Sequence, residues 1–296
     1  MNQFLSLSFN GLSLGAIYAL VALGFVIIFK ASEVLNFAHG SLLLLGAYVV
    51  ARLQHGIGFF PAVGVGVAAA AVAALIIQRV IITPLRGAPV ISLAIITIGV
   101  DILLFTQLNR LIGSDILSLN HPWGGKSFTI GGVGITQNRA IAMVVAAVVI
   151  ALFFTAFKYS SWGVAMRAAA EDGETAALMG IRLGRISALA WVIAGALAAI
   201  AGVFLTGAPT PGLQPGIGAI ALRAFPAAIL GGLDSTAGAL VGGLVIGLAE
   251  SYTAGYQDKI LFLGRGFGDV MPYVVMIAVL LVRPTGLFGT KELTRV

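Results

Sequence analysis

The sequence predicts an all-α integral membrane protein, a polytopic helix bundle of about eight to nine transmembrane segments that include broken helices. Hydrophobic residues make up 59% of the 296-residue chain, and mean hydropathy is +1.05. Charged residues make up 9%, whereas soluble proteins carry about 25%. A soluble domain of this size needs a charged and polar surface. The composition therefore excludes an ordinary cytosolic enzyme.

Apolar stretches of membrane-spanning length follow one another along the chain. A helix needs about 20 residues to cross the hydrocarbon core of a bilayer, which is ~30 Å thick. Nothing between the stretches resembles a linker, so residues 1–296 are predicted to form a single transmembrane domain. We expect nine spans at residues 11–29, 36–53, 58–78, 89–108, 139–157, 187–206, 216–233, 236–254 and 269–283.

The positions of the basic residues predict the orientation. The first ten residues carry no charge, unlike the basic start of a cleaved signal peptide, so the first span is expected to be retained. Cytoplasmic loops accumulate Lys and Arg, and the flanking basic residues favour an outside N-terminus and a cytoplasmic C-terminus by ten to six. This placement accounts for the net charge of +6. We expect a lipid bilayer and no nucleic acid among the partners.

Two segments between the spans are long enough to hold structure. Residues 109–138, predicted outside, contain the run SFTIGGVGITQN, which is typical of a small extracytoplasmic β-hairpin. Residues 158–186, predicted inside, carry the densest charge. There Ser161 is expected to cap a helix that ends near Ala170, Asp172 to cap a second short helix, and Gly180 to stop it. Such a helix indicates a docking element, with a solvated connector as the alternative.

Small residues are spaced for close helix packing. Within a bilayer, helices associate where small residues let their backbones approach. We expect these glycines to pack helices within one subunit, with a subunit interface as the alternative. The helix-packing candidates are Gly11, Gly15, Gly238, Gly242, Gly243 and Gly247.

Ionisable residues inside spans cost about 2.5–3.5 kcal/mol each to insert and are functional candidates. With the predicted orientation Asp101, Arg223 and Glu250 lie at one depth in the membrane. Opposite charges at a common depth form a structural ion pair or line a water-filled cavity. Pro226 is expected to kink or break its span. Asn36 and His39 open the second span and are expected to line the pathway; the alternative is that Asn36 caps this helix and His39 bonds to a neighbouring carbonyl oxygen. The candidates for the translocation pathway are Asn36, His39, Asp101, Arg223, Pro226 and Glu250.

Catalysis and metal binding are not expected in this chain. It has no cysteine and three histidines, which are far apart in sequence, so neither thiolate metal sites nor disulfides form. No span carries paired histidines or clustered carboxylates at helical spacing, which disfavours a membrane enzyme. A stand-alone ion-coupled secondary transporter or channel, working through Asp101 and Glu250, stays open as the alternative class.

Several segments together resemble a known family. They are NGLSLGAIYALVALGFVIIFK, VLNFAHGSLLLLGAY, GVAMRAAAEDGETAALMGI, ALRAFPAAILGGLDSTAGALVGG, GLAES and RPTGLFG. The chain is similar to the permease subunits of bacterial branched-chain amino acid ABC importers. In that family the segment matching residues 170–180 is a cytoplasmic coupling element that docks on an ATPase. The resemblance thus implies ATPase-coupling roles, within residues 158–186, for Arg167, Glu171, Asp172, Glu174 and Gly180.

The resemblance also implies a function and partners. It implies a permease subunit of an ATP-driven importer in the bacterial cytoplasmic (inner) membrane, for branched-chain or other small amino acids. The implied partners are a second permease subunit (a related chain or a second copy), two cytoplasmic ATPase subunits and an extracytoplasmic substrate-binding protein. ATP and Mg belong to the ATPases, and no cofactor is expected in this chain. Urea, short amides and small aromatic acids are alternative cargoes for the same class of importer. The chain departs from the family pattern at Arg223, at Asp234 and over residues 256–267, and these differences bear on the identity of the cargo.

Overall fold

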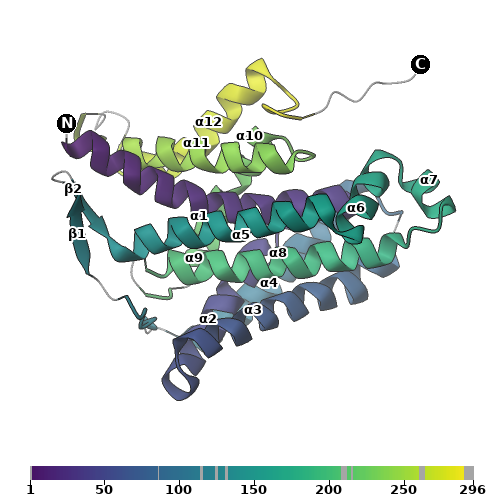
Figure 1. The fold of residues 1–296 in the computed structure, drawn as a ribbon, viewed down its shortest axis with the longest axis horizontal. Helices are drawn as coiled ribbons and strands as arrows, with labels where there is room; N and C mark the ends of the chain where they lie inside the picture. Colours follow the sequence, from purple (N-terminus) through teal and green to yellow (C-terminus); the bar gives the residue numbers. More distant parts are fainter. Residues whose placement is uncertain are drawn as a thin grey trace.

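The computed structural model describes residues 2–85, 87–113, 116–123, 126–130, 133–207, 212–214, 216–259 and 264–289. The long helices run along one axis, with a two-stranded sheet at one end and α7 at the other (Figure 1). The elements are α1 (Asn2–Ser32), α2 (His39–Ile57), α3 (Phe59–Ile76), a π-helical turn (Ile77–Ile82), a 3-10 turn (Thr83–Leu85), α4 (Val90–Ile112), β1 (Ser127–Ile130), β2 (Val133–Thr136), α5 (Gln137–Tyr159), α6 (Ser161–Glu171), α7 (Gly173–Leu178), α8 (Leu183–Leu205), α9 (Ile217–Arg223), α10 (Phe225–Gly231), α11 (Thr236–Gly255) and α12 (Phe267–Val282).

The helical membrane bundle is confirmed, but the predicted count of eight to nine spans is not. Among the described residues, six helices are long and apolar enough to cross a membrane: α1, α3 with its continuation to Leu85, α4, α5, α8 and α11. α12 and the α9–α10 segment are apolar but shorter. α2 has 19 residues, but Arg52, Gln54 and His55 make its last turns polar.

The predicted hairpin is present. β1 and β2 pair antiparallel, with Ser127 opposite Thr136 and Phe128 opposite Ile135. α5 begins directly after β2, so the hairpin marks the end of the bundle at which α5 starts.

α1 begins nine residues before the predicted span and has 31 residues, which gives it a length of about 46 Å. Its polar first turns bond to α11. Ser251 Oγ donates to the Leu7 carbonyl oxygen at 2.8 Å, and the hydroxyls of Ser8 and Tyr252 lie 2.8 Å apart. These bonds compensate for the low hydropathy that made the first residues look unlike a span.

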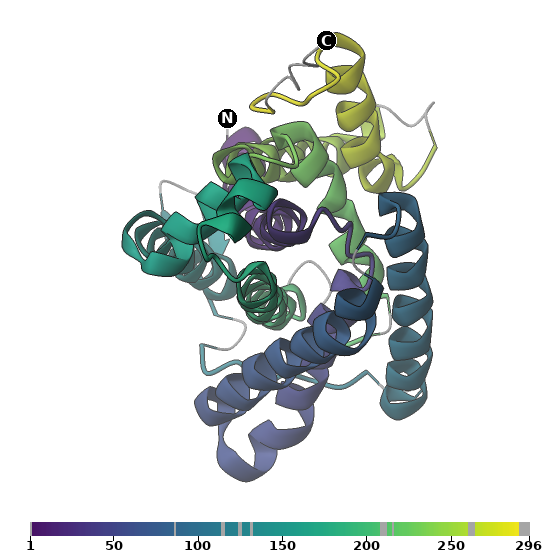
Figure 2. The same ribbon diagram turned by 90° about the vertical axis from the view of Figure 1, so that its right-hand side faces the viewer.

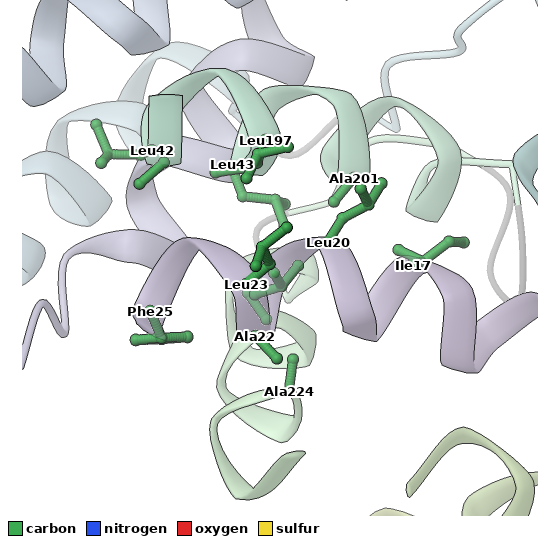
Figure 3. Close-up of a cluster of buried hydrophobic side chains, with 14 of the residues drawn as sticks. Ile17, Leu20, Ala22, Leu23, Phe25, Leu42, Leu43, Leu197, Ala201 and Ala224 are labelled. Carbon is green, nitrogen blue, oxygen red and sulfur yellow. The ribbon is translucent and has the colours of Figure 1, made fainter. Parts of the chain in front are cut away.

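α1 lies near the centre of the bundle, with α5, α8 and α11 packed around it (Figure 2). Its side chains supply much of the buried core. Leu23 and Leu20 lie on the side facing α8, where Leu197 belongs, while Ala22 points towards Ala224 on the opposite side (Figure 3). α1 is therefore shielded from lipid over most of its length.

The span predicted at residues 216–233 is broken, as expected from Pro226. α9 ends at Arg223 and α10 begins at Phe225, with Pro226 in its first turn. Proline has no N–H and fits a first turn, so it starts a helix more readily than it continues one. Each half has seven residues and a length of about 10 Å, too short to cross a bilayer alone.

A second break, residues 33–38, joins α1 to α2 inside the bundle. Val34, Asn36 and Ala38 are buried. Thr97 Oγ1 of α4 donates to the Leu35 carbonyl oxygen at 2.8 Å and accepts from the Phe37 amide at 3.2 Å. Irregular backbone is tolerated at membrane depth where protein groups satisfy it, and here α4 does so.

The six predicted packing glycines make two contacts, one between α1 and α11 and one between α11 and α10. Gly11 and Gly15 of α1 face α11, and Gly243 and Gly247 of α11 face α1. A Cβ added at Gly243 would lie 2.5 Å from the Ala19 amide nitrogen. Gly238 and Gly242 instead touch the backbone of α10. The contact of Gly11, Gly15, Gly243 and Gly247 is called the glycine seam below.

We expect Gly243→Ala to lower the free energy of unfolding by about 1–3 kcal/mol, because its methyl group would overlap the α1 backbone. Gly99→Ala in α4 is the matched control, since a Cβ there meets nothing within 4 Å. Thermal unfolding of both purified variants in detergent measures the effect. Equal stability of the two variants would contradict the seam.

Candidate functional site

One charged cluster joins four helices of the bundle. Arg223 Nη1 of α9 lies 3.1 Å from Glu250 Oε1 of α11 and 2.7 Å from Asp269 Oδ1 of α12. The Tyr18 hydroxyl of α1 donates to Glu250 Oε2 at 2.8 Å. The Glu250 side chain is 8% exposed and that of Asp269 is 62% exposed. The cluster therefore runs from the buried core to the surface.

The structure brings two of the three predicted intramembrane charges together and leaves the third apart. Asp101 accepts a 2.5 Å hydrogen bond from Ser41 Oγ, so it links α4 to α2. A shared depth fixes a residue along the bundle axis but not around it, which is why Asp101 does not meet Arg223.

Sequence reasoning missed Tyr18 and Asp269. Asp269 stands in the first turn of α12, at the edge of its span, where a search for charges within spans passes over it. Tyr18 had a usable signal, because it follows Gly11 by seven residues and Gly15 by three and so shares their helix face.

The cluster forms part of the wall of a cavity of about 400 Å³ at the hairpin end of the bundle. α1, α5, α9, α11 and α12 contribute to the lining. Arg139 and Asn138 of α5 line the same cavity as Arg223, Glu250 and Asp269. We call this space the polar cavity. It offers both signs of charge to a small solute.

Asn36 and His39 do not line the polar cavity. Asn36 Oδ1 accepts from the Ala38 amide at 3.2 Å, but the N-cap of α2 is Ala38 and makes no side-chain cap bond, so Asn36 holds the turn before α2 and does not cap the helix. The His39 ring packs against Phe25 with centroids 4.7 Å apart, and a Cβ at Gly24 would lie 2.6 Å from it. Within the described part of the chain, neither His39 nitrogen makes a hydrogen bond of ordinary geometry. Both residues belong to the packed core.

The two helix breaks face each other through aromatic rings. The Phe225 ring, at the start of α10, lies 5.4 Å from that of Phe37 and 5.3 Å from that of Phe25. Pro226 is buried beside them. The irregular segments of α1–α2 and α9–α10 are thus neighbours in the interior, a geometry typical of transporter pathways.

α6 is fixed to the end of α5. Ser160, not the predicted Ser161, caps α6 by accepting from the Gly163 amide at 3.1 Å; Ser160 keeps extended backbone while Ser161 is already helical. The Arg167 guanidinium donates to the carbonyl oxygens of Phe157 and Lys158. Arg167 therefore stabilises the α5–α6 corner.

α7 is short but closed at both ends. Asp172 accepts from the Thr175 amide at 3.0 Å, as predicted for a cap. Gly180 has φ +87°, and the Ile181 and Gly180 amides donate to Ala176 and Ala177. This pattern is the Schellman motif, so the predicted stop is present.

The surface of this capped helix is exposed. Leu178 is 88% and Met179 is 80% exposed, and Glu171 and Glu174 are exposed beside them. α7 projects at the end of the bundle opposite the hairpin (Figure 1). We call Glu171, Glu174, Leu178 and Met179 the α7 surface.

Comparison with known proteins identifies the family. Residues 7–280 match the family described as branched-chain amino acid transport system / permease component. The chain belongs to this family. The permease is 35% identical to the high-affinity branched-chain amino acid transport system permease protein LivH of Escherichia coli (strain K12), over 99% of its length and 98% of LivH. It is 35% identical to the corresponding protein BraD of Pseudomonas aeruginosa, over 97% of this chain and 96% of BraD.

A solved structure, PsaBC from Streptococcus pneumoniae in complex with Fab, aligns with a TM-score of 0.49 at 18% identity, over 92% of this chain and 89% of that one. The family assignment rests on the sequence matches. It makes the chain a multi-pass transport permease rather than an enzyme, and favours an importer subunit over a stand-alone transporter.

We expect Arg223→Gln to destabilise the permease by about 3 kcal/mol, because it leaves the buried Glu250 carboxylate without its cation. The double variant Arg223→Gln/Glu250→Gln should regain part of the loss. Asp269→Asn is the control and should cost less than about 1 kcal/mol, because Asp269 is largely exposed. Unfolding in detergent measures all three, and an equal loss in Asp269→Asn would contradict this ranking.

The cap of α7 should depend on pH. Hydrogen bonds from the Thr175 side chain and amide lower the pKa of Asp172 below its usual value. The stabilisation is therefore complete above the pKa of the unfolded chain and is lost as pH falls through the lower pKa of the folded state. Hydrogen exchange of the Thr175 amide should show this loss. Asp172→Asn keeps the acceptor without the charge and should remove the pH dependence, whereas Asp172→Ala should remove protection throughout.

Proposed function

We propose that the permease is a membrane subunit of an ATP-driven importer for branched-chain or other small amino acids. The observation that carries this proposal is the 35% identity to LivH over 99% of the chain. LivH is a high-affinity branched-chain amino acid transport system permease protein. A match over 99% of the chain supports the same class of cargo here. An extracytoplasmic binding protein would deliver the solute.

We propose that two cytoplasmic ATPase subunits, holding ATP and Mg, dock on the α7 surface. α7 has six residues and a length of about 9 Å, too short to be stable without its caps and neighbours. Two exposed apolar side chains at its end are suited to an apolar groove on a partner. Glu171 and Glu174 would then favour basic residues at the rim of that groove.

This arrangement requires α7 in the cytoplasm and the hairpin outside. The basic residues near α7 support that orientation, because Lys158, Arg182 and Arg185 flank the two short helices and cytoplasmic loops are rich in such residues. The bacterial inner membrane is the matching location.

A second permease subunit, either a related chain or a second copy, would complete the pathway. α4 carries exposed apolar side chains along its length, including Ile91, Ile95 and Leu103, so this face is suited to lipid or to a partner helix. The neighbouring breaks at residues 33–38 and Ala224 supply places where helices can change angle between outward and inward access.

We expect Glu171→Lys to reduce ATP-driven leucine uptake at least about tenfold, because it replaces an anion of the α7 surface by a cation. Gly180→Pro should do the same, since proline cannot adopt the positive φ of Gly180 and lacks its N–H. Uptake is measured in proteoliposomes that contain the complete transporter.

Asp258→Lys is the matched control, because it makes the same charge change at an exposed carboxylate outside the α7 surface. Its uptake should stay near that of the unmodified permease. Normal uptake by Glu171→Lys and Gly180→Pro, with equal protein inserted, would refute the docking assignment. Uptake by the purified permease alone would refute the importer itself.

A further inference from the structure

We infer that the polar cavity binds an aliphatic α-amino acid as a zwitterion, with its carboxylate at the start of α5 and its ammonium beside Asp269 and Glu250. The inference deepens the proposed function and rests on it, because it assigns a binding site for the cargo within this subunit.

The carboxylate side is built on Arg139, an unused donor at the start of α5. Arg139 is half-buried in the first turn of α5, and across the described residues its guanidinium has no ion pair or hydrogen bond. A cation at a helix N-terminus opposes the helix dipole, so an anion there would relieve an unfavourable arrangement. Arginine also binds a carboxylate through two parallel hydrogen bonds.

Asn138 precedes Arg139 and fixes the first turn of α5 against a neighbouring segment. Asn138 is 6% exposed, and its Oδ1 accepts from Trp123 Nε1 at 2.9 Å. That bond fixes the orientation of the amide, yet Nδ2 has no partner within the described part of the chain. Nδ2 is covered from solvent and lies beside Gly207, which does not line the polar cavity, so Arg139 is the donor of α5 that an anionic ligand group would reach.

The opposite wall carries an excess of negative charge. Glu250 and Asp269 share the single cation Arg223, so this group has a net charge of −1. Asp269 is largely exposed and is accessible to an ammonium group. With Arg139, the four charged side chains of the cavity sum to zero. A zwitterion matches both walls and adds no net charge, whereas a solute with one charge would leave one wall unmatched.

Apolar residues complete the cavity. Leu14, Ile17, Ala142 and Ala254 line it together with the charged groups. They offer hydrophobic contact to a branched aliphatic side chain, and the volume of about 400 Å³ leaves space for water around it. Ser13 Oγ donates to the Arg139 carbonyl oxygen at 3.0 Å, which fixes the start of α5 against α1 and holds the two walls in register.

Binding of radiolabelled L-leucine to the purified full-length permease in lipid nanodiscs tests the site. We expect saturable binding that Arg139→Gln weakens at least about tenfold, as for loss of a charge-assisted pair. Arg139→Lys should retain part of the affinity. Arg110→Gln, which removes an exposed arginine from the last turn of α4, is the matched control and should bind normally. Leucinamide and 4-methylpentanoate, each lacking one charge, should compete weakly.

Three results would overturn the inference: no saturable binding by the unmodified permease, equal binding by Arg139→Gln and Arg110→Gln, or leucinamide competing as well as leucine. Thermal unfolding of each variant verifies that it is folded, and if Arg139→Gln is not, Arg139→Lys and the two analogues decide the matter. ATP-driven uptake by the complete transporter separates the two proposals. If the unmodified transporter takes up leucine and Arg139→Gln changes neither binding nor uptake, only this site is rejected. If the unmodified transporter takes up no leucine, the proposed function is rejected.

Discussion

The close approach of α1 and α11 is the constraint on which the rest of the structure depends. The glycine seam removes side chains from both helices at their contact, so that the two backbones touch directly. This proximity places the Tyr18 hydroxyl 2.8 Å from Glu250. Glu250 then holds Arg223 of the broken α9–α10 segment, and Arg223 holds α12 through Asp269. The backbone contact in the core therefore determines where the charged groups lie, from Glu250 in the interior to Asp269 at the surface.

The interior breaks are stable because polar partners replace the missing helical hydrogen bonds. Thr97 bonds to the backbone on both sides of Asn36, and Asn36 bonds to Ala38. A bilayer supplies no such partners, so irregular backbone survives only where another helix covers it. α4 therefore has two distinct sides: Thr97 bonds to the α1–α2 break, while its exposed apolar residues are suited to lipid or a second subunit.

Sequence patterns predicted elements that local rules determine and missed contacts that depend on tertiary placement. The long helices, the hairpin, the Asp172 cap and the Gly180 stop follow from hydropathy, turn residues and capping, each of which acts over a few neighbouring residues. The common depth of Arg223 and Glu250 in the membrane predicted an ion pair as one of two possibilities. The same criterion wrongly grouped Asp101 with them and did not indicate Asp269. Rotation about the bundle axis decides such pairs, and no short-range pattern encodes it. The first turns of α1 were missed for the same reason, since their partners belong to α11.

The hydrogen bonds between the end of α5 and α6 fix the angle between these two helices. α5 is one unbroken helix of 23 residues, about 35 Å long. One of its ends is clamped to α6 by Arg167 and Ser160, and its other end carries Arg139. A displacement of α6 would therefore be carried along α5 to its first turn, where Arg139 lines the polar cavity and Ser13 of α1 bonds to the Arg139 carbonyl oxygen. The α7 end of the bundle and the polar cavity are thus connected by a single continuous helix.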